Sequence, residues 1–534
     1  MKLVPSLLFF MATIPLSAES QDEPAIVAGK NIAIVQTVYG AVRGYIHHGI
    51  FTFKGIPYGE AERFLPAQKP ASWKGIRSSM TYGPVCPGNL GPVLSDEYEF
   101  PFHRDRGYYS NENCLNLNIW TKKTGAGEKK PVMVWLHGGG FSSGSSVEFP
   151  SYDGENLSRK GDVVVVSINH RLNTLGFLDL SAYGEKYKYS GNAGAMDMVL
   201  ALTWVKENIA QFGGDPGNVT IFGQSGGGAK VVCLMNTPSA KGLFHKAIVQ
   251  SGSYLTHFTE DSIAKKVSAA LLDLLKIEPS QIDSLQKMPY DILAAAGQKA
   301  LAKVQKTLKP GDVTVFGLDW EPIRDGDYLP YQPGEAAAIE LSKDIPLLVG
   351  SCKNEYNPFN PATRELSIEG VRAQLQKKYG EKTAAYMAAV KKAYPETVKP
   401  SDYIDIDLIF RPLVIGEADQ KALSGTAPVF VYLFAWQSPV MDGIFKAYHN
   451  MDLPFVFNNI GRCEEMTGGG KEAYVMADKV STAWANFAHR GNPNHKGLPV
   501  WPSYTPENGA VMIFDRECQV KNHHDQELLA LRAH

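Results

Sequence analysis

Gly223-Gln224-Ser225-Gly226-Gly227 is the segment whose residue types and spacing point most directly to chemistry. A β-branched and aromatic run typical of a strand precedes it (218–222), and a run typical of a helix follows it (228–235). A G-x-S-x-G sequence between a strand and a helix is a nucleophile elbow, in which a sharp turn presents the serine hydroxyl at the carboxyl edge of a sheet. The pattern therefore predicts that Ser225 is a nucleophile.

A glycine-rich segment earlier in the chain predicts the second part of this chemistry. The apolar run 132–136 is typical of a buried strand and leads into His137-Gly138-Gly139-Gly140. Glycines allow backbone N–H groups to turn into a cavity, where they stabilise the negative oxygen of a tetrahedral intermediate. Three glycines alone also occur in ordinary tight turns. Their position after a buried strand and ahead of the elbow favours an oxyanion hole.

Ser225 needs a general base, and in this architecture an acid and then a histidine follow the serine. Of the thirteen histidines, those far enough along the chain are His449, His489, His495, His523, His524 and His534. His523, His524 and His534 lie in a polar tail, His489 ends a helical run, and His495 lies in a turn-rich loop. His449 follows the strongly β-forming run 429–436 by one loop, so it can reach the same sheet edge. We expect His449 to be the base.

Glu355 is the best candidate for the acid that orients this histidine. It follows the compact apolar run 345–350, which again places it at the carboxyl end of a strand. Such an acid fixes the imidazole tautomer and stabilises the imidazolium without taking the proton. Asp325 and Asp327 are alternatives that look more like a turn, and Asp452 is too close to the histidine in sequence.

The elements that must position these residues alternate between strands and helices. The core strands and helices are expected between residues 115 and 255, and residues 33–60 suggest a small antiparallel sheet. Residues 260–306 and 367–396 are rich in Ala, Leu and Lys at helical spacing. We expect these two helical blocks to fold over the carboxyl edge as walls of a gorge.

Composition excludes several other classes of protein. The chain has 534 residues and a formal charge of −2, with no basic run that would suggest nucleic-acid binding. Ala229 stands where a phosphate loop needs lysine, and Ser143 breaks a dinucleotide fingerprint. No cluster has the spacing of metal ligands, so no metal or cofactor is expected.

The first residues predict export. A basic start and an apolar segment lead to small residues, so we expect a signal peptide over residues 1–20, cleaved after Ala18 or Ser20. No later apolar run is long enough to cross a membrane. The protein is expected to be secreted or periplasmic, without stable membrane insertion. Residues 21–534 contain no low-complexity linker, which favours a single domain.

With these residues in place, the chain resembles the type-B carboxylesterases, the cholinesterase-like branch of the α/β-hydrolases. The resemblance covers nearly the whole mature chain. Beyond the elbow and the triglycine loop, its segments are Phe53-Lys54-Gly55-Ile56-Pro57-Tyr58, Glu112-Asn113-Cys114-Leu115-Asn116-Leu117-Asn118, Asn169-His170-Arg171-Leu172, Phe212-Gly213-Gly214-Asp215-Pro216 and Gln250-Ser251-Gly252-Ser253. It implies an α/β fold with a central, mostly parallel, twisted sheet flanked by helices, and helical insertions that form an active-site gorge.

The resemblance also implies a reaction and its residues. Ser225 would be the nucleophile, Glu355 the acid and His449 the base of a two-step hydrolysis of neutral carboxylic esters through an acyl-enzyme. The same triad would serve a lipase or an amidase, and a catalytically silent binding protein would keep the fold alone. The oxyanion donors would be the N–H groups of Gly139, Gly140 and Gly226.

Several positions depart from the family pattern. Gly226 stands where alanine is usual, Gln224 replaces the frequent glutamate before the serine, and Asn113 replaces an aspartate. Tyr356 and Asn450 stand where glycine usually follows the acid and the histidine. Losing the carboxylate at position 224 disfavours cationic substrates.

The resemblance further implies a disulfide between Cys86 and Cys114, which match the family's first loop disulfide. Export permits disulfides. A pairing of Cys463 with Cys518 stays open, because sequence cannot settle connectivity.

Overall fold

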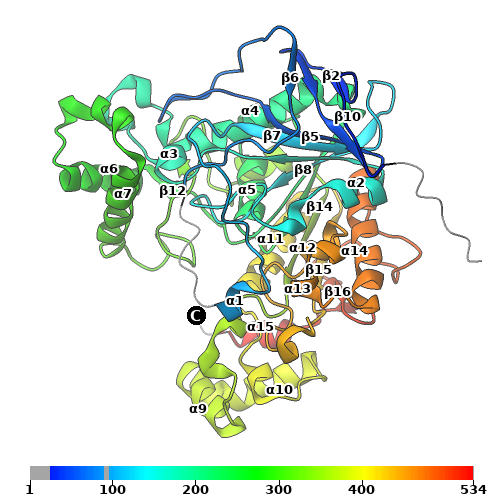
Figure 1. The fold of residues 1–534 in the computed structure, drawn as a ribbon. Coiled ribbons are helices and arrows are strands. Elements are labelled where there is room, and N and C mark those ends of the chain that lie inside the picture. Colours follow the sequence, from blue (N-terminus) through cyan, green and yellow to red (C-terminus); the bar gives the residue numbers. More distant parts are fainter. Residues whose placement is uncertain (1–23, 89–95, 533–534) are drawn as a thin grey trace, which may run out of the picture.

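The structure is a computed structural model that describes residues 24–88 and 96–532. The expected signal peptide, residues 1–20, lies outside the described residues. A large twisted sheet runs through the molecule, with helices packed on both of its faces (Figure 1).

Twelve strands form this sheet. Their spatial order is β1 (Ile26–Val27), β4 (Tyr45–His47), β5 (Ile50–Pro57), β7 (Asn116–Thr121), β9 (Val164–Ile168), β8 (Lys130–Leu136), β10 (Gly214–Gln224), β11 (Lys246–Gln250), β14 (Leu347–Cys352), β15 (Val429–Phe434), β16 (Ala510–Phe514) and β17 (Gln519–Asn522). From β9 to β16 every neighbouring pair is parallel, and the pairs at both ends are antiparallel. The expectation of a mostly parallel central sheet is therefore confirmed.

The helices connect these strands and cover them. They are α1 (Asp96–Glu99), α2 (Glu155–Gly161), α3 (Asn173–Phe177), α4 (Ala193–Asn208), α5 (Gly226–Met235), α6 (Asp261–Leu275), α7 (Tyr290–Gln305), α8 (Ala336–Ser342), α9 (Ile368–Tyr379), α10 (Thr383–Ala393), α11 (Phe410–Ser424), α12 (Leu453–Val456), α13 (Glu464–Thr467), α14 (Lys471–Arg490) and α15 (Gln526–Ala530).

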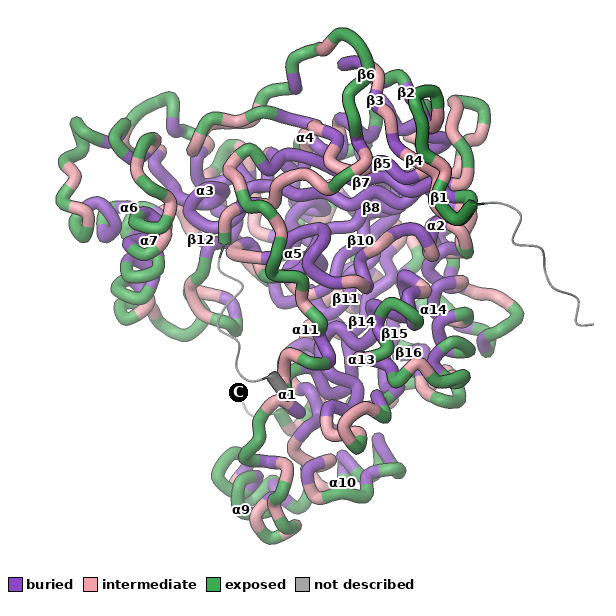
Figure 2. The backbone as a smooth tube through the Cα atoms, in the orientation of Figure 1, coloured by how far each residue is buried: buried purple, intermediate pink, exposed green. Residues whose placement is uncertain are grey.

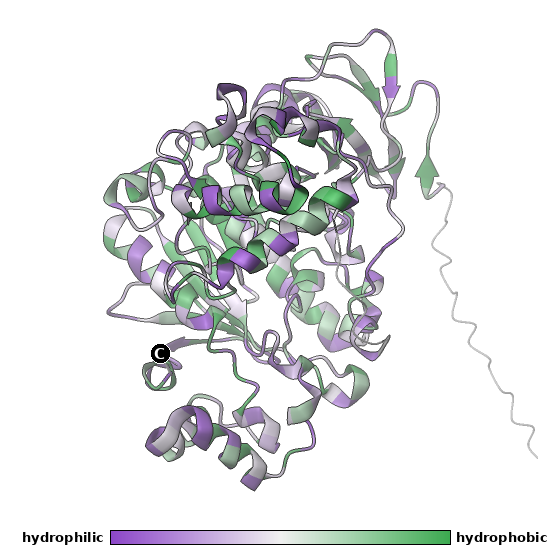
Figure 3. Cartoon of the chain, turned by 90° about the vertical axis from the view of Figure 1, so that its left-hand side faces the viewer, coloured by the Kyte–Doolittle hydropathy of each residue, from purple (hydrophilic) through white to green (hydrophobic). Residues whose placement is uncertain are grey.

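Two hydrophobic cores lie on opposite faces of the sheet. In β8, Val132, Val134 and Leu136 belong to one core, whereas Met133 and Trp135 belong to the other. This alternation follows from the two-residue period of a strand. Helices α4, α5 and α11 contribute to the first core, and α2, α12 and α14 to the second. Because both faces are covered, the central strands are almost continuously apolar, as their colouring in Figure 3 shows.

The N-terminal part differs in detail from the expected small antiparallel sheet. Strands β2 (Ile34–Gln36) and β3 (Ala41–Arg43) are antiparallel and form a separate sheet with β6 (Ile76–Ser78). Strands β4 and β5 instead extend the large sheet at its edge. The remaining small sheet pairs β12 (Thr259–Glu260) with β13 (Ile323–Arg324).

The two expected helical blocks are helical. The first contains α6 and α7, which pack against each other, and the second contains α9 and α10. They stand at two separate corners of the molecule (Figure 1) and carry much exposed surface, whereas the strands between them are buried (Figure 2). Among the described residues, no helix has the length and apolar character that a membrane span requires.

Candidate active site

The carboxyl edge of the parallel strands carries the predicted nucleophile. Strand β10 ends at Gln224, helix α5 begins at Gly226, and Ser225 joins them with φ 56° and ψ −127°. This strained backbone is held because the Ser225 N–H donates to the Gln250 carbonyl oxygen at 2.8 Å. A Cβ at Gly227 would lie 1.9 Å from the Leu136 oxygen, so the turn admits only glycine there. The segment has the geometry of a nucleophile elbow.

Glu355 and His449 are in direct contact, as expected for an acid and a base. The Glu355 Oε2 atom hydrogen-bonds to Nδ1 of His449, and both side chains are buried. The other carboxylate oxygen, Oε1, accepts hydrogen bonds from Ser251 Oγ at 2.7 Å and from the Cys352 N–H at 2.7 Å. The two residues are also joined through the main chain, because the backbone N–H of His449 donates to the backbone carbonyl oxygen of Glu355 at 3.0 Å. The Glu355 carboxylate thus has three hydrogen-bond partners: His449 Nδ1, Ser251 Oγ and the Cys352 N–H.

The alternative acids have other partners. Asp325 accepts a hydrogen bond from Asn192 at 2.9 Å, and Asp327 pairs with Lys188 on the surface. Asp452 accepts from Gln250 and Tyr432, and burial raises its pKa to about 6. Of the four candidate acids, Glu355 is therefore the one hydrogen-bonded to Nδ1 of His449.

The imidazole also faces the elbow. Nε2 of His449 lies 3.2 Å from the side-chain amide nitrogen of Gln224, the residue before the predicted nucleophile. Nδ1 of the same ring lies 3.5 Å from that nitrogen, so the Gln224 side chain lies against the imidazole. A nucleophile–base hydrogen bond is often long in an enzyme without substrate and tightens on binding.

The triglycine loop lies against the elbow. Gly139 and Gly140 have φ values of 89° and 61°, which favour glycine. A Cβ at Gly226 would lie only 2.1 Å from the Gly140 nitrogen. The departure from the family's alanine at position 226 therefore accompanies a very close approach of the loop to the elbow.

Each of the three candidate oxyanion N–H groups belongs to a peptide whose carbonyl oxygen accepts a hydrogen bond. The carbonyl and N–H of one peptide point in opposite directions, so a bond to the carbonyl also orients the N–H. The carbonyl oxygen of Gly138 accepts from His137 Nδ1 at 2.8 Å. The Gly139 carbonyl oxygen accepts from the Ser143 N–H at 3.0 Å. The Ser225 carbonyl oxygen accepts from Ala229, one helical turn along α5, at 3.0 Å.

Lys230 also holds a carbonyl of the triglycine loop in place, and the sequence analysis did not anticipate this role. It is fully buried on α5, and its Nζ donates to the His137 carbonyl oxygen at 2.8 Å. Burial lowers the pKa of this amine to about 7, although the nearby Glu148 carboxylate opposes the shift. Burial also lowers the pKa of His137, which keeps that ring neutral and able to donate from Nδ1. The available signal was a lysine inside an otherwise apolar helical run directly after the elbow.

Two of the departures from the family pattern have a structural explanation. Asn450 has φ 76°, a left-handed conformation that asparagine tolerates. Tyr356 has φ −80°, so no glycine is needed there, and the positive φ falls on Glu355 instead. The Tyr356 ring packs on His449 with 4.1 Å between ring centroids.

The expected disulfide is not formed. All six cysteines are free thiols in this structure, so the expected bond between Cys86 and Cys114 is absent, and Cys463 and Cys518, whose pairing the sequence left open, are not joined either. Cys86 and Cys114 are buried neighbours, and the hydrogen bond between them, followed by burial, raises the pKa of the Cys114 thiol. The Cys86 sulfur also accepts from the Leu172 N–H at 3.3 Å.

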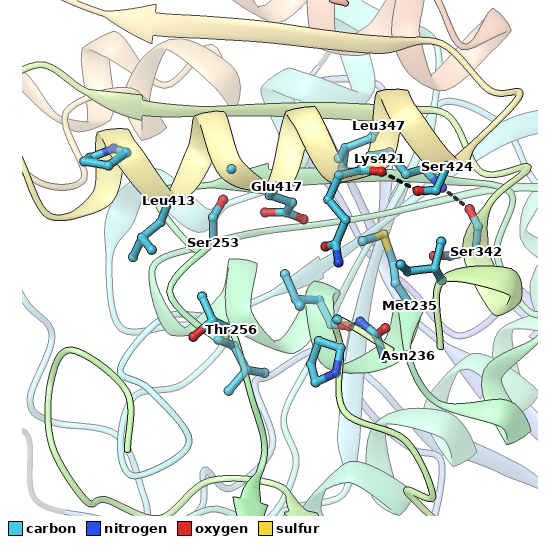
Figure 4. Close-up of a pocket in the computed structure, with 18 of the residues that line it drawn as sticks. Met235, Asn236, Ser253, Thr256, Ser342, Leu347, Leu413, Glu417, Lys421 and Ser424 are labelled. Atoms are coloured by element: carbon cyan, nitrogen blue, oxygen red, sulfur yellow. Dashed lines mark hydrogen bonds between the residues drawn. The ribbon is translucent and has the colours of Figure 1, made fainter. Parts of the chain in front are cut away.

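A cavity of about 440 Å³ lies between α5, the loop after β11, and α11 (Figure 4). Ser253 and Glu417 both line this cavity and lie side by side in it (Figure 4). Both carboxylate oxygens of Glu417 are buried, and burial raises its pKa to about 7. None of the three triad candidates lines this cavity. Within residues 24–88 and 96–532, no group of three or more His, Cys, Asp or Glu residues is placed to hold a metal ion.

Comparison with known proteins agrees with this geometry. The sequence model of the carboxylesterase family matches residues 31–531. The chain is 37% identical to para-nitrobenzyl esterase of Bacillus subtilis, over 92% of this chain and 97% of that protein. It is 30% identical to liver carboxylesterase 1 of Oryctolagus cuniculus, over 90% and 89% of the two chains. A solved esterase from Clostridium hathewayi superposes with a TM-score of 0.83 at 38% identity, covering 94% of this chain and 98% of that one. The chain therefore belongs to the carboxylesterase family, has the α/β-hydrolase fold, and is a carboxylic ester hydrolase.

Proposed function

We propose that this protein hydrolyses neutral carboxylic esters with the triad Ser225, His449 and Glu355, through an acyl-enzyme. The observation that carries the proposal is the buried hydrogen bond between Glu355 Oε2 and His449 Nδ1, in a ring that also lies against the side chain of Gln224, the residue before Ser225. A carboxylate on Nδ1 leaves Nε2 unprotonated and able to accept the serine proton.

The reaction then proceeds in two steps. Nε2 of His449 takes the proton of Ser225 as its oxygen attacks the ester carbonyl, and the imidazolium gives that proton to the leaving alcohol. Water then enters, gives a proton to the same nitrogen and attacks the acyl carbon, and the imidazolium returns that proton to the Ser225 oxygen as the acid leaves. The N–H groups of Gly139, Gly140 and Gly226 stabilise the oxyanion in both steps. Removing one such donor typically costs about 10²- to 10³-fold in turnover.

The substrate is a small neutral ester. Gln224 places an uncharged amide beside the imidazole, where a carboxylate would attract cations. The names of relatives support esters with an aromatic part: one is a para-nitrobenzyl esterase, and the Clostridium enzyme is described as hydrolysing aliphatic aromatic polyesters. The protein reaches its substrate outside the cytoplasm, after cleavage of the signal peptide over residues 1–20. Amino-terminal sequencing of the exported protein tests this last point, and a start at Met1 would contradict it.

The deciding experiment compares the wild type with Ser225→Ala on p-nitrophenyl esters from acetate to palmitate. Triad knockouts lower turnover by about 10⁶-fold in a well-studied serine protease, so we expect a loss of several orders of magnitude. A fluorophosphonate probe should label Ser225 in the wild type and fail to label the variant. Preference for the longest, micellar esters would indicate a lipase instead. A folded protein without activity on any ester would contradict the proposal.

A further inference from the structure

A buried lysine anchors the loop that leads into the proposed base. Lys446 lies three residues before His449, and its side chain is only 6% exposed. Its Nζ donates to Asp402 Oδ1 at 2.7 Å and to Asp405 Oδ2 at 2.9 Å. A third bond, at 3.2 Å, goes to Ser401 Oγ. Because an ammonium group has three donors, all of them are used, and all bind one earlier segment of the chain.

The backbone of this loop is unfavourable by itself. Met441, Asp442 and Lys446 have φ values of 51°, 56° and 56°, in the left-handed region that residues other than glycine rarely adopt. Such conformations persist only where surrounding contacts determine them. Lys446 supplies contacts of this kind, through its ammonium group and through its carbonyl oxygen, which accepts from the Ser438 N–H at 3.2 Å. We therefore expect the loop to relax when the ammonium group is removed.

The segment that carries the acid belongs to the same network. Asn354 precedes Glu355, and its backbone N–H donates to the Ala447 carbonyl oxygen at 3.1 Å. The side-chain oxygen of Asn354 accepts from the Ala447 N–H at 3.1 Å, and its side-chain nitrogen donates to the Asp405 carbonyl oxygen at 2.8 Å. Asp405 thus binds the acid segment through its main chain and Lys446 through its carboxylate.

We propose that Lys446 is a positioning residue for the proposed base. Its two ion pairs hold the loop so that the imidazole of His449 stays against the Glu355 carboxylate. The inference rests on the proposed function and adds a residue that acts through the base. A misplacement of about 1 Å can cost about 10²-fold in rate, so a small relaxation of the loop would change turnover.

The test compares Lys446→Met with the wild type on p-nitrophenyl acetate, with turnover expressed per active site. Diethyl p-nitrophenyl phosphate phosphorylates a catalytic serine and releases one p-nitrophenol per site, so the final extent of release counts functional sites. We expect Lys446→Met to lower kcat per titrated site by about 10- to 100-fold, with little change in KM. A lysine that only stabilised the fold would reduce the number of sites and leave kcat per site unchanged, which would overturn the inference.

Lys130→Met is the matched control. Lys130 also lies near two carboxylates, with Nζ 2.7 Å from Asp162 and 3.9 Å from Glu128, and its side chain is 14% exposed. It begins β8, at the opposite end of that strand from the triglycine loop. This variant should keep the wild-type kcat per site. An equal loss in both lysine variants would overturn the inference, because it would reflect a general effect of removing a paired lysine.

Asp405→Asn tests the same network with a smaller change, and carries the test if Lys446→Met does not fold. The amide oxygen can still accept from the ammonium group, and the backbone bond to Asn354 is kept. We expect kcat per site to fall about 2- to 10-fold, the equivalent of one weakened hydrogen bond. In the double variant the loss should be smaller than the product of the two single losses, because both changes break one pair. Fully multiplicative losses would contradict a role for this ion pair.

The outcomes separate the inference from the proposed function. If Ser225-dependent hydrolysis persists and the Lys446 and Asp405 variants keep the wild-type kcat per site, Lys446 does not position the base, although the triad proposal stands. If the phosphate triester does not modify Ser225 and no ester is hydrolysed, both proposals fail together.

Discussion

The ring of Tyr356 lies on the imidazole of His449, with 4.1 Å between centroids and 31° between the planes. The family pattern has glycine at this position, so the side chain that packs on the imidazole is a departure from that pattern. Desolvation of its hydroxyl raises the pKa of the Tyr356 phenol, and a hydrogen bond with the Ser225 hydroxyl lowers it. Tyr356 therefore contacts the proposed base and the proposed nucleophile at once.

Removal of this hydroxyl alone should free the nucleophile. In Tyr356→Phe the ring still packs on His449, but Ser225 loses a competing partner. We expect the rate of acylation, measured by stopped-flow release of p-nitrophenol, to rise about 2- to 10-fold, the equivalent of one hydrogen bond of about 0.5–1.5 kcal/mol. A tenfold fall would mean instead that the phenol orients the serine or stabilises the transition state.

Ser251 is expected to act through the acid. Its hydroxyl donates to Glu355 Oε1 at 2.7 Å, whereas Ser253, two residues on, lines the neighbouring cavity beside Glu417. Hydrogen bonds to charged groups contribute about 1.5–3 kcal/mol. Because Ser251 does not touch the reacting atoms, we expect Ser251→Ala to lower kcat by only about 3- to 30-fold and to shift its pH profile.

Ser253→Ala is the matched control for this experiment, since it removes the same atom from the same loop. It should retain wild-type kcat. Equal turnover in Ser251→Ala and wild type would end the role assigned to Ser251.

Lys230 should matter for the transition state more than for substrate binding. Lys230→Met removes the donor at the His137 carbonyl and leaves a buried acceptor unpaired, which costs about 1–3 kcal/mol. If that carbonyl positions the oxyanion loop, kcat should fall about 10- to 100-fold with little change in KM. The affinity for a trifluoromethyl ketone, which forms a tetrahedral adduct, should fall in parallel.

Lys246 provides the control for a general effect of removing a buried lysine. It begins β11, at the opposite end of the strand from the site, and its amine contacts Asn218. Burial lowers the pKa of Lys246 to about 8, as it does for Lys230 to about 7. Lys246→Met should cost stability without this selective loss of kcat; the same loss in both variants would exclude a positioning role.

The parts of the site that sequence reasoning anticipated depend on local backbone rules. The elbow at Ser225 requires small neighbours whatever the rest of the chain does, and parallel strands bring their carboxyl ends to one edge. Position after a strand was therefore enough to select Glu355 and His449, which the structure brings into contact. The two helical blocks followed from the helical spacing of their residues, and the mostly parallel sheet followed from the family resemblance.

The parts that were missed depend on packing between distant segments. Phe316 and Phe410 are ordinary aromatic residues in the sequence, and only the fold places them in contact beside the imidazole. The role of Lys230 depends on where the end of β8 passes over α5. The expected Cys86–Cys114 disulfide is absent from the structure, in which both cysteines are buried free thiols.

The buried carboxyl of Glu417 should make stability depend on pH in a defined direction. Its pKa is about 7 in the folded protein, against about 4.3 for a glutamate in an unfolded chain. Between these values the folded state holds a proton that the unfolded state has released, so the free energy of unfolding falls as the pH rises from about 4.3 through 7. The wild type should therefore lose on the order of 2–4 kcal/mol from this group by pH 8.

Glu417→Gln removes the titration while keeping the size and a polar tip. Urea unfolding at pH 5 and pH 8 should show a smaller loss of stability in this variant than in the wild type, by that same 2–4 kcal/mol, so at pH 8 the variant should be the more stable protein. Glu340→Gln is the control, because Glu340 is exposed and pairs only with Lys343 at the surface. It should follow the wild type at both pH values. If Glu417→Gln also follows the wild type, Ser253 and Lys421, which both favour the charged carboxylate, offset its burial and the prediction is wrong.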